Sequence, residues 1–330
     1  MSALLQIDNL TVSLTVDGEQ REVLRGLDVE LEAGKTLGLV GESGSGKSMT
    51  ARTIGRLLPS GAQTSGSVTF DGADVLGMRG GTLRSYRTRD VAMIFQDPRS
   101  AINPVRRIGD FLTEALKVSH GMKAQAANAR AVELLAEVGI EDGERRLKQY
   151  PHELSGGLLQ RVMIASAVAV RPRLILADEP TTALDVTSQA EVMAILARLR
   201  EEYGMAMLFI THDLELASAV CHQTMVMYAG SAVERQASLG LHESPLHPYT
   251  AALVRARPDI TAAAPRLFAI QGHPTTAYEA PAGCAFAPRC AYAQEACAEP
   301  VALRQVRGGL TACRRSEELA DQLAHPEVSA

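Results

Sequence analysis

The stretch Leu37-Gly-Leu-Val-Gly-Glu-Ser-Gly-Ser-Gly-Lys-Ser48 decides the fold. It contains the pattern Gly-x-x-x-x-Gly-Lys-Ser between a short apolar run at 37–40 and a segment at 49–58 with helical spacing. Glycine lets the backbone curl so that its N–H groups point inward, which makes an anion nest at the N-terminus of a helix. The pattern therefore predicts a loop that cradles the phosphates of a nucleotide.

The side chains of this loop have separate expected roles. Lys47 is expected to contact the β and γ phosphates, and Ser48 to offer its hydroxyl group to Mg²⁺. Other positions are expected to line the same nucleotide: Gly41, Ser43, Gly44, Gly46 and Met49. The alternative is a Gly- and Ser-rich turn with an accidental lysine, but the strand and helix on either side favour the nucleotide site.

Composition narrows the class of protein. The chain has 330 residues, of which 46% are hydrophobic and 22% charged, and its formal net charge is −5. Because nucleic acids select basic stripes and the Lys and Arg residues here are scattered, no nucleic acid partner is expected. The apolar runs are too interrupted to cross a membrane, and residues 1–8 lack the basic start of a secretory signal. We expect a cytoplasmic chain whose cysteines stay reduced.

Residues 4–31 predict a half-buried β-hairpin. Apolar and polar residues alternate over 10–16 and 23–31, and Asp17-Gly18 supplies the turn between them. No Phe, Tyr or Trp precedes Phe70, so these strands offer the nucleotide base no aromatic ring. We expect apolar contact from Leu14 and Val23 instead, which leaves base selectivity as the least defined part of the site.

Polar residues follow two predicted buried strands. Gln96 comes after residues 91–95, and the acidic pair Asp178-Glu179 ends the run at 174–177. Ligands of open α/β sheets bind at the carboxyl ends of parallel strands. We therefore expect Gln96 to contact Mg²⁺ or the attacking water, Asp178 to hold Mg²⁺ through water, and Glu179 to polarise the water that attacks the γ-phosphate.

Two further segments carry residues suited to binding an anion such as a nucleotide phosphate. His212 follows the predicted strand at 205–210 and could donate to the γ-phosphate. Within 98–153, helical apolar spacing predicts helices at 108–117, 124–138 and 144–150, and Ser155-Gly156-Gly157 then precedes another helix-like segment. These three residues offer backbone N–H groups and a hydroxyl group to an anion. A single chain rarely needs two such nests unless the second serves another nucleotide.

In this order the motifs resemble those of the nucleotide-binding subunit of an ABC transporter. The carriers of the resemblance are the P-loop at 41–48, the Q-loop Gln96, the signature Leu154–Gly157, the Walker B pair Asp178 and Glu179, the D-loop Ala183-Leu184-Asp185 and the switch His212. The resemblance implies an active ATPase that uses ATP and Mg²⁺. It also implies that two subunits associate head to tail, so that the signature and Asp185 of one close on the ATP of the other.

The resemblance also implies a fold and its parts. The expected class is α/β: a P-loop NTPase (RecA-like) core with an N-terminal antiparallel β-subdomain, an inserted α-helical subdomain and a C-terminal extension that contains cysteines. We expect the core and β-subdomain at 1–97 and 166–240, the helical subdomain with the signature at 98–165, and the extension at 241–330.

The tail indicates a subfamily. Residues 244–250, Ser-Pro-Leu-His-Pro-Tyr-Thr, resemble a segment found in the ATPases of oligopeptide, dipeptide and nickel importers. Four cysteines follow with the spacing C-x5-C-x6-C-x15-C, at Cys284, Cys290, Cys297 and Cys313. Their clustering in a cytosolic chain indicates metal rather than disulfide, and composition alone leaves a cluster, zinc and free thiols open. The resemblance favours a 4Fe-4S cluster.

The resulting hypothesis is the ATPase subunit of a binding-protein-dependent importer of dipeptides or oligopeptides. It implies two membrane permease subunits, a second and different ATPase subunit, and an extracytoplasmic substrate-binding protein. It also implies a peripheral position on the cytoplasmic face of the inner or plasma membrane. The alternatives are uptake of nickel or a metal chelate, a soluble ABC ATPase of DNA repair or translation, and a redox-responsive regulator that only binds ATP.

Overall fold

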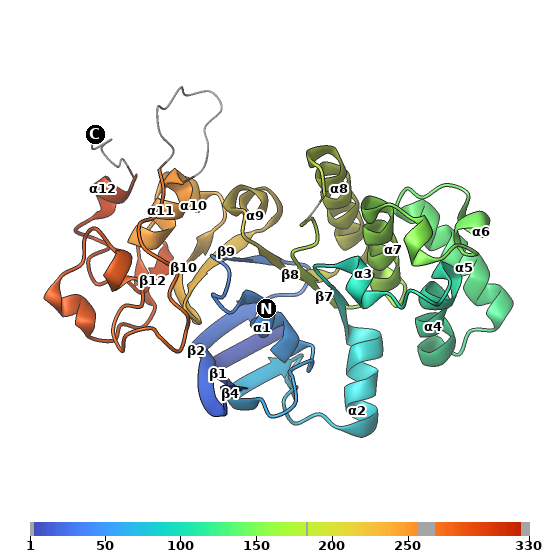
Figure 1. The fold of residues 1–330 in the computed structure, drawn as a ribbon, viewed down its shortest axis with the longest axis horizontal. Helices are drawn as coiled ribbons and strands as arrows, with labels where there is room; N and C mark the ends of the chain where they lie inside the picture. The colour runs from blue at the N-terminus through green and yellow to red at the C-terminus, as the bar shows by residue number, and fades with distance from the viewer. Residues whose placement is uncertain (1–2, 183, 257–267, 325–330) are drawn as a thin grey trace. The chain divides into compact units, whose positions relative to one another are not determined.

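The computed structural model describes residues 3–182, 184–256 and 268–324 and forms two compact units (Figure 1). The first unit contains 1–4, 31–36 and 72–210, and the second contains 5–30, 37–71 and 211–330. Within the described residues, no helix combines the length and apolar composition that crossing a bilayer requires. The domain boundaries predicted at 97, 165 and 240 stay predictions.

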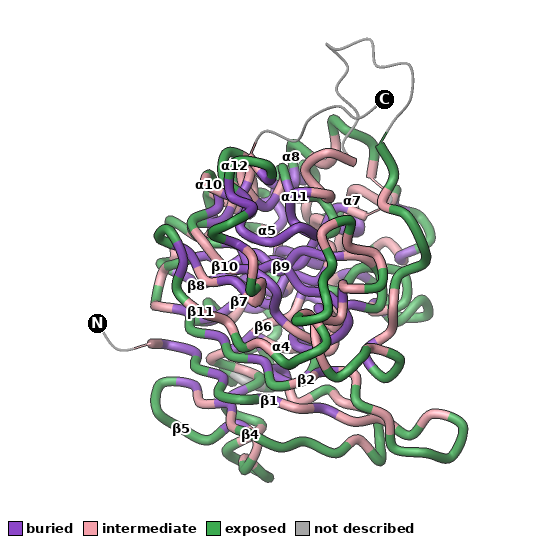
Figure 2. Tube along the Cα trace, turned by 90° about the vertical axis from the view of Figure 1, so that its left-hand side faces the viewer, coloured by how far each residue is buried: buried purple, intermediate pink, exposed green. Residues whose placement is uncertain are grey.

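The N-terminal strands of the second unit form an antiparallel sheet, as predicted. Its strands β1 (Leu5–Val16), β2 (Glu19–Leu31) and β4 (Gln63–Phe70) lie in the order β2-β1-β4. Leu5 pairs with Phe70 at one end of the β1–β4 ladder, and the register shifts between Asp8 and Thr11. The first half of β4, residues 63–66, is exposed, whereas the strand at 223–228 is buried from residue 224 onward (Figure 2).

A second sheet of this unit holds the phosphate loop. Strand β3 (Thr36–Val40) runs parallel to β9 (Gln223–Tyr228), which pairs antiparallel with β10 (Ser231–Ala237). The hairpin of β11 (Arg304–Val306) and β12 (Gly309–Thr311) then extends the sheet beyond β10. The helices of this unit are α1 (Lys47–Ile54), α9 (Leu214–Val220), α10 (Gly240–Glu243), α11 (Pro248–Arg255) and α12 (Ala320–Ala324).

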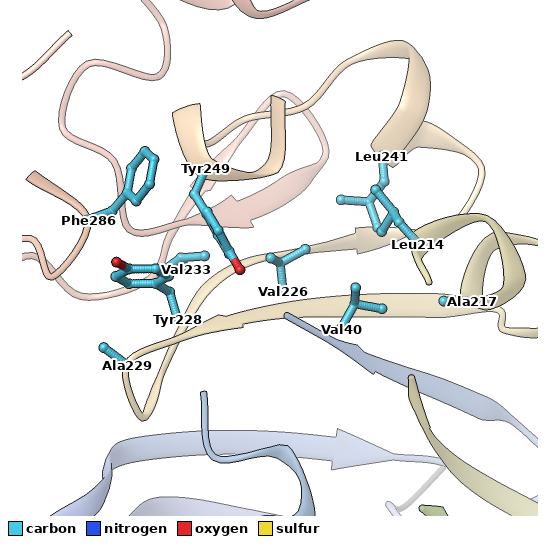
Figure 3. Packing of buried hydrophobic residues seen from close by; sticks show 10 residues of the cluster. All are labelled: Val40, Leu214, Ala217, Val226, Tyr228, Ala229, Val233, Leu241, Tyr249 and Phe286. Carbon is cyan, nitrogen blue, oxygen red and sulfur yellow. The ribbon is translucent and has the colours of Figure 1, made fainter. Parts of the chain in front are cut away.

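Buried side chains tie the C-terminal segment to this sheet (Figure 3). Val40 and Val226 from the paired strands belong to one buried cluster with Tyr228, and Tyr249 of α11 and Phe286 are members of the same cluster. The ring centroids of Tyr228 and Tyr249 are 4.7 Å apart, in an edge-to-face arrangement that is favourable for aromatic pairs. The segment that follows β10 therefore shares a core with the strand that leads into the phosphate loop.

The first unit contains three parallel strands in the order β8-β7-β6. These are β6 (Val91–Ile94), β7 (Leu174–Asp178) and β8 (Ala206–Thr211), with Ile94 opposite Ala177 and Ala177 opposite Phe209. Residues of β7 and β8 are all buried, as expected for parallel strands. The unit also contains β5 (Ala73–Asp74), α2 (Gly80–Ser85), α3 (Pro98–Ala101), α4 (Ile108–His120), α5 (Ala124–Glu137), α6 (Gly143–Arg146), α7 (Gly156–Val168) and α8 (Val186–Tyr203).

One predicted helix is shorter than expected. Helical spacing extends over 144–150, but α6 ends at Arg146. The carbonyl groups of Leu147 and Gln149 accept hydrogen bonds from Gly109 and Ile108 at the start of α4. These carbonyl groups therefore do not continue α6, and Pro151 disfavours helix at the residue before it.

The backbone conformation of Gly66 in β4 yields a testable prediction. Gly66 has φ +82°, and a methyl group there would collide with the carbonyl oxygen of Asn9 on β1. Gly66→Ala should therefore lower the free energy of unfolding by roughly 3 kcal/mol, combining backbone strain with overpacking. Urea unfolding followed by circular dichroism measures the change.

Gly18 is the matched control for this prediction. Its φ is +83°, but a methyl group there would have no heavy atom within 4 Å. Gly18→Ala should lose only about 1 kcal/mol, because it carries the backbone strain without the collision. Equal losses in the two variants would contradict the role of the β1–β4 contact.

Candidate functional site

The phosphate loop is held by its own lysine. Lys47, the first residue of α1, is buried, and its Nζ donates to the carbonyl oxygens of Gly41 at 2.8 Å and Glu42 at 2.9 Å. A third contact joins Nζ to Ser45 Oγ at 3.3 Å. The ammonium group is therefore fixed within the loop, where a nucleotide phosphate would need a cation.

The glycines of the loop are required by its shape. Gly44 and Gly46 have φ values of +81° and +102°, which L-residues with side chains rarely adopt. A methyl group at Gly41 would collide with the carbonyl oxygen of Met227 on the adjacent strand. The second unit contains every sequence-predicted residue of this loop: Gly41, Ser43, Gly44, Gly46, Lys47, Ser48 and Met49.

Within the first unit the structure brings Gln96 and Glu179 together. Gln96 follows β6, Glu179 follows β7, and the Nε2 of Gln96 donates to Oε2 of Glu179 at 2.9 Å. Thr182 Oγ1 donates to the same carboxylate oxygen at 2.8 Å. Two donors thus orient one carboxylate at the carboxyl ends of neighbouring parallel strands, the edge at which ligands of open α/β sheets bind.

The backbone of Glu179 is held in an unfavourable conformation. Its φ of +46° lies in the left-handed region, and its N–H donates to the carbonyl oxygen of Ile210 on β8 at 3.0 Å. Such conformations cost about 1–3 kcal/mol and occur most often at functional sites. Asp178, one residue earlier, is the buried last residue of β7.

The signature and D-loop residues begin two helices of the first unit. Ser155 is the N-cap of α7, and its Oγ accepts a hydrogen bond from the N–H of Leu158 at 3.4 Å. Gly156 and Gly157 form the first turn of α7. Asp185 caps α8, and its hydrogen bonds from the hydroxyl and N–H of Ser188 lower the pKa of its carboxyl group. Ala183 lies outside the described residues.

His212 lies in the second unit, directly after β8. Its side chain is exposed, and the next residue, Asp213, caps α9 by accepting hydrogen bonds from the N–H groups of Glu215 and Leu216. Leu14 and Val23, which are expected to contact the nucleotide base, also lie in this unit, and both are half-buried.

Sequence reasoning missed two residues that contact the phosphate loop. Arg289 pairs with the carboxylate of Glu42, and the hydroxyl group of Tyr249 accepts a hydrogen bond from the N–H of Glu42. The only sequence signal for either was the His-Pro-Tyr segment at 247–249, which indicated a subfamily but not a contact with the loop.

The four cysteines of the tail line one cavity. Arg314 and Arg315 line the same cavity as Cys284, Cys290, Cys297 and Cys313. Burial raises the pKa values of the Cys284, Cys290 and Cys313 thiols, the last to about 11. In the described part of the chain, no group of three or more His, Cys, Asp or Glu residues is arranged to hold a metal ion.

A buried carboxylate anchors the start of α11. Glu234 of β10 is fully buried and accepts hydrogen bonds from the N–H groups of Leu246 at 2.9 Å and His247 at 2.8 Å. His247 in turn caps α11 by accepting a hydrogen bond from the N–H of Tyr249 at 3.0 Å. Burial raises the pKa of Glu234 to about 7, although these hydrogen bonds oppose the shift.

Comparison with known proteins assigns the chain to a class. Residues 24–182 match the family model of the ABC transporter, which includes the phosphate loop and the acidic strand end. A solved dimeric structure of a bacterial ABC transporter cassette is 27% identical, with a TM-score of 0.64 over 71% of this chain and 98% of that one. The fold is therefore the ABC ATPase cassette, a P-loop NTPase, as predicted.

The tail and the relatives with assigned names place the chain in a branch of the ABC transporter family. Residues 233–297 match the C-terminal region of oligopeptide and dipeptide transporters. The oligopeptide transport ATP-binding protein OppD of Escherichia coli is 40% identical over 96% of this chain and 94% of its own length. The dipeptide transport ATP-binding protein DppD of Haemophilus influenzae is 42% identical over 89% and 90%.

The chain belongs to the ABC transporter ATP-binding proteins, in the family that includes OppD and DppD. It is an ATPase that uses Mg²⁺ and couples ATP hydrolysis to transport. ATP-binding subunits of such import systems are peripheral membrane proteins that work with membrane permease subunits.

The pKa of Glu234 predicts how stability depends on pH. Its folded-state pKa of about 7 lies above the ordinary 4.5, so the folded chain binds more protons than the unfolded chain between these values. Burial of Glu234 should therefore lower the free energy of unfolding by roughly 1 kcal/mol per pH unit as the pH rises from about 4.5 to 7, while the buried His247, whose pKa burial lowers to about 3, contributes a slope of opposite sign. Glu234→Gln should remove this part of the slope in thermal unfolding at pH 5, 6 and 7.

Glu243→Gln provides the comparison, because Glu243 is a nearby exposed residue at the end of α10. It should keep the wild-type slope. If Glu234→Gln also kept that slope, the titration of Glu234 would not govern stability in this range.

Proposed function

We propose that this chain is the ATP-hydrolysing subunit that energises a binding-protein-dependent importer of dipeptides or oligopeptides. The observation that carries the proposal is the match of 233–297 to the oligopeptide and dipeptide transporter C-terminal region, together with relatives named for peptide transport over nine-tenths of the chain. Uptake of nickel or a metal chelate by the same ATPase is the alternative that the tail resemblance raised.

The proposed hydrolytic residues are those of the phosphate loop and of the polar strand ends. Glu179 activates the attacking water, supported by the two hydrogen bonds that orient its carboxylate. Asp178 and Ser48 hold Mg²⁺ with Gln96 as a further ligand, and Lys47 binds the β and γ phosphates. His212 donates to the γ-phosphate. The nucleotide contacts of Gly41, Ser43, Gly44, Gly46 and Met49 complete the proposal.

A second copy or sister subunit completes the proposed site. Ser155, Gly156 and Gly157 of one subunit bind the ATP held by the phosphate loop of another, and Asp185 lies at the same contact. Two observations support this arrangement: Ser155 begins α7 at an exposed position, and the fold is similar to a cassette solved as a dimer. ATP binding closes the pair and hydrolysis releases it, which moves the permease subunits.

The proposed assembly contains two permease subunits, a second and different ATPase subunit, and an extracytoplasmic substrate-binding protein. The chain works at the cytoplasmic face of the inner or plasma membrane. The names of the relatives support a transport role, because they describe ATP-binding proteins of oligopeptide and dipeptide transport.

Replacement of Glu179, the proposed general base, tests both its role in hydrolysis and the class of imported substrate. Glu179→Gln keeps the size and hydrogen-bonding shape of the side chain but removes the charge that accepts the proton of water. In cells that depend on this system for peptide nitrogen, the variant should abolish uptake of a labelled dipeptide. The purified full chain should still bind ATP and should hydrolyse it at least 100-fold more slowly.

Glu191→Gln is the control, because this exposed residue of α8 pairs with Arg161 and has no proposed part in hydrolysis. It should leave dipeptide uptake unchanged. Unchanged turnover in Glu179→Gln would overturn the assignment of the base. ATP-dependent uptake of nickel but not of dipeptides in the wild-type cells would overturn the substrate.

We propose further that Cys284, Cys290, Cys297 and Cys313 hold a 4Fe-4S cluster. The kinds of donor fit the group: four thiols line one cavity, and Arg314 and Arg315 there would offset the negative charge of a thiolate-bound cluster. The spacing of these side chains in the structure is not itself that of a metal site. When bound, the cluster would link the parts of the tail that carry these four cysteines covalently.

Iron and acid-labile sulfide analysis of the anaerobically purified full chain tests this site. Close to four irons and four sulfides per chain, with visible absorbance, are expected. Replacing Cys290 and Cys297 together by Ser should remove both. The same substitution at Cys221, a buried cysteine that the cavity does not include, should remove neither. Zinc, or no metal, in the wild-type chain would overturn the proposal.

A further inference from the structure

One residue of the phosphate loop is held by the C-terminal segment. Glu42 follows the first glycine of the loop, and both oxygens of its carboxylate accept hydrogen bonds from Arg289. The Nη1–Oε2 distance is 2.6 Å and the Nη2–Oε1 distance is 3.2 Å. The Arg289 side chain is only 4% exposed, and that of Glu42 is 24% exposed. Paired, shielded contacts of this kind are the stronger and more directional form of an ion pair.

The backbone of the same residue has two more attachments. Its N–H donates to the hydroxyl oxygen of Tyr249 at 2.9 Å, and its carbonyl oxygen accepts from Nζ of Lys47 at 2.9 Å. Tyr249 is itself immobilised by the aromatic cluster with Tyr228 and Phe286, where ring centroids lie 4.7 and 5.1 Å away (Figure 3). Glu42 is therefore fixed through its side chain, its N–H and its carbonyl group.

Arg289 is also positioned before any ligand arrives. Its Nε donates to the carbonyl oxygen of Gln271 at 2.9 Å, and its Nη1 donates to the hydroxyl oxygen of Tyr228 at 3.2 Å. These bonds orient the planar guanidinium group toward Glu42 and reduce the entropy that the pair must lose. Preorganisation of this kind is an effective way to raise affinity.

The charge of Glu42 explains why the loop needs such a partner. A carboxylate within a loop that receives a triphosphate repels the ligand unless a cation neutralises it. Arg289 supplies that cation from 247 residues away in the sequence, and Tyr249 fixes the backbone at a separation of 207 residues.

We propose that Arg289 and Tyr249 are positioning residues that set the affinity of the phosphate loop for ATP. They act through Glu42 and do not touch the nucleotide. The inference rests on the proposed binding of ATP by this loop and is independent of the imported substrate. It assigns the His-Pro-Tyr segment a role in nucleotide affinity through its tyrosine.

Nucleotide titration of the full chain tests the inference. The probe is Mg²⁺ with a fluorescent ATP analogue, and steady-state hydrolysis gives KM and kcat. Arg289→Ala should raise Kd and KM about tenfold and change kcat less than twofold, because the repulsion acts on binding. Adding Glu42→Gln to Arg289→Ala should bring Kd back to within about threefold of wild type.

Two conservative variants report on the separate contacts. Tyr249→Phe keeps the aromatic packing but removes the acceptor for the N–H of Glu42, so Kd should rise about threefold. Arg289→Lys keeps the charge without the paired geometry and should give an intermediate Kd. If Arg289→Ala fails to fold, Arg289→Lys still tests whether the paired contact affects Kd.

Arg304→Ala is the matched control. Arg304 forms an ion pair of 3.1 Å with Glu317 in the same segment, and its other hydrogen bonds go to the carbonyl oxygens of Cys313 and Arg314 rather than to the loop, so its loss should leave Kd unchanged. A wild-type Kd in Arg289→Ala, or a Kd that Glu42→Gln fails to restore, would overturn the inference. Failure of the wild-type chain itself to bind ATP would instead overturn the proposed function of the loop.

Discussion

A loop that offers its N–H groups to an anion cannot use all of them to hold its own shape. The phosphate loop meets this constraint in two ways. Its glycines permit the required backbone angles, and Lys47 binds the carbonyl groups of Gly41 and Glu42. The remaining support comes from the side chains of Tyr249 and Arg289, so the ligand-binding backbone is shaped by groups that need not touch the ligand.

At the acidic edge of the first unit, contacts from neighbouring groups likewise fix a functional residue. Glu179 stands just beyond a fully buried strand, and its N–H is bound to the neighbouring strand in a strained backbone conformation. Gln96 and Thr182 then orient its carboxylate. The parallel strands stabilise this strained conformation, so that one reactive side chain is fixed at their end.

The positions of the motifs at the ends of strands could be predicted from the sequence because each motif extends over only a few residues. The loop at 41–48, Gln96 and the pair Asp178-Glu179 were placed on the correct strand ends by apolar runs and their polar termini. The early end of α6 could not be foreseen, because carbonyl groups at 147 and 149 are taken by α4. The ion pair of Glu42 and Arg289 joins residues 247 apart, and no local pattern encodes such a contact.

The pairing of Glu42 with Arg289 also bears on how this family can diversify. A tail that supplies both a buried cation and a tyrosine acceptor to the nucleotide loop is not an exchangeable module, even though it follows the last motif of the cassette. A recombinant that joined this cassette to the tail of a relative would keep Glu42 but would lose the Arg289 and Tyr249 that contact it in this chain. Such exchanges should succeed only where residues 42, 249 and 289 are transferred as a set.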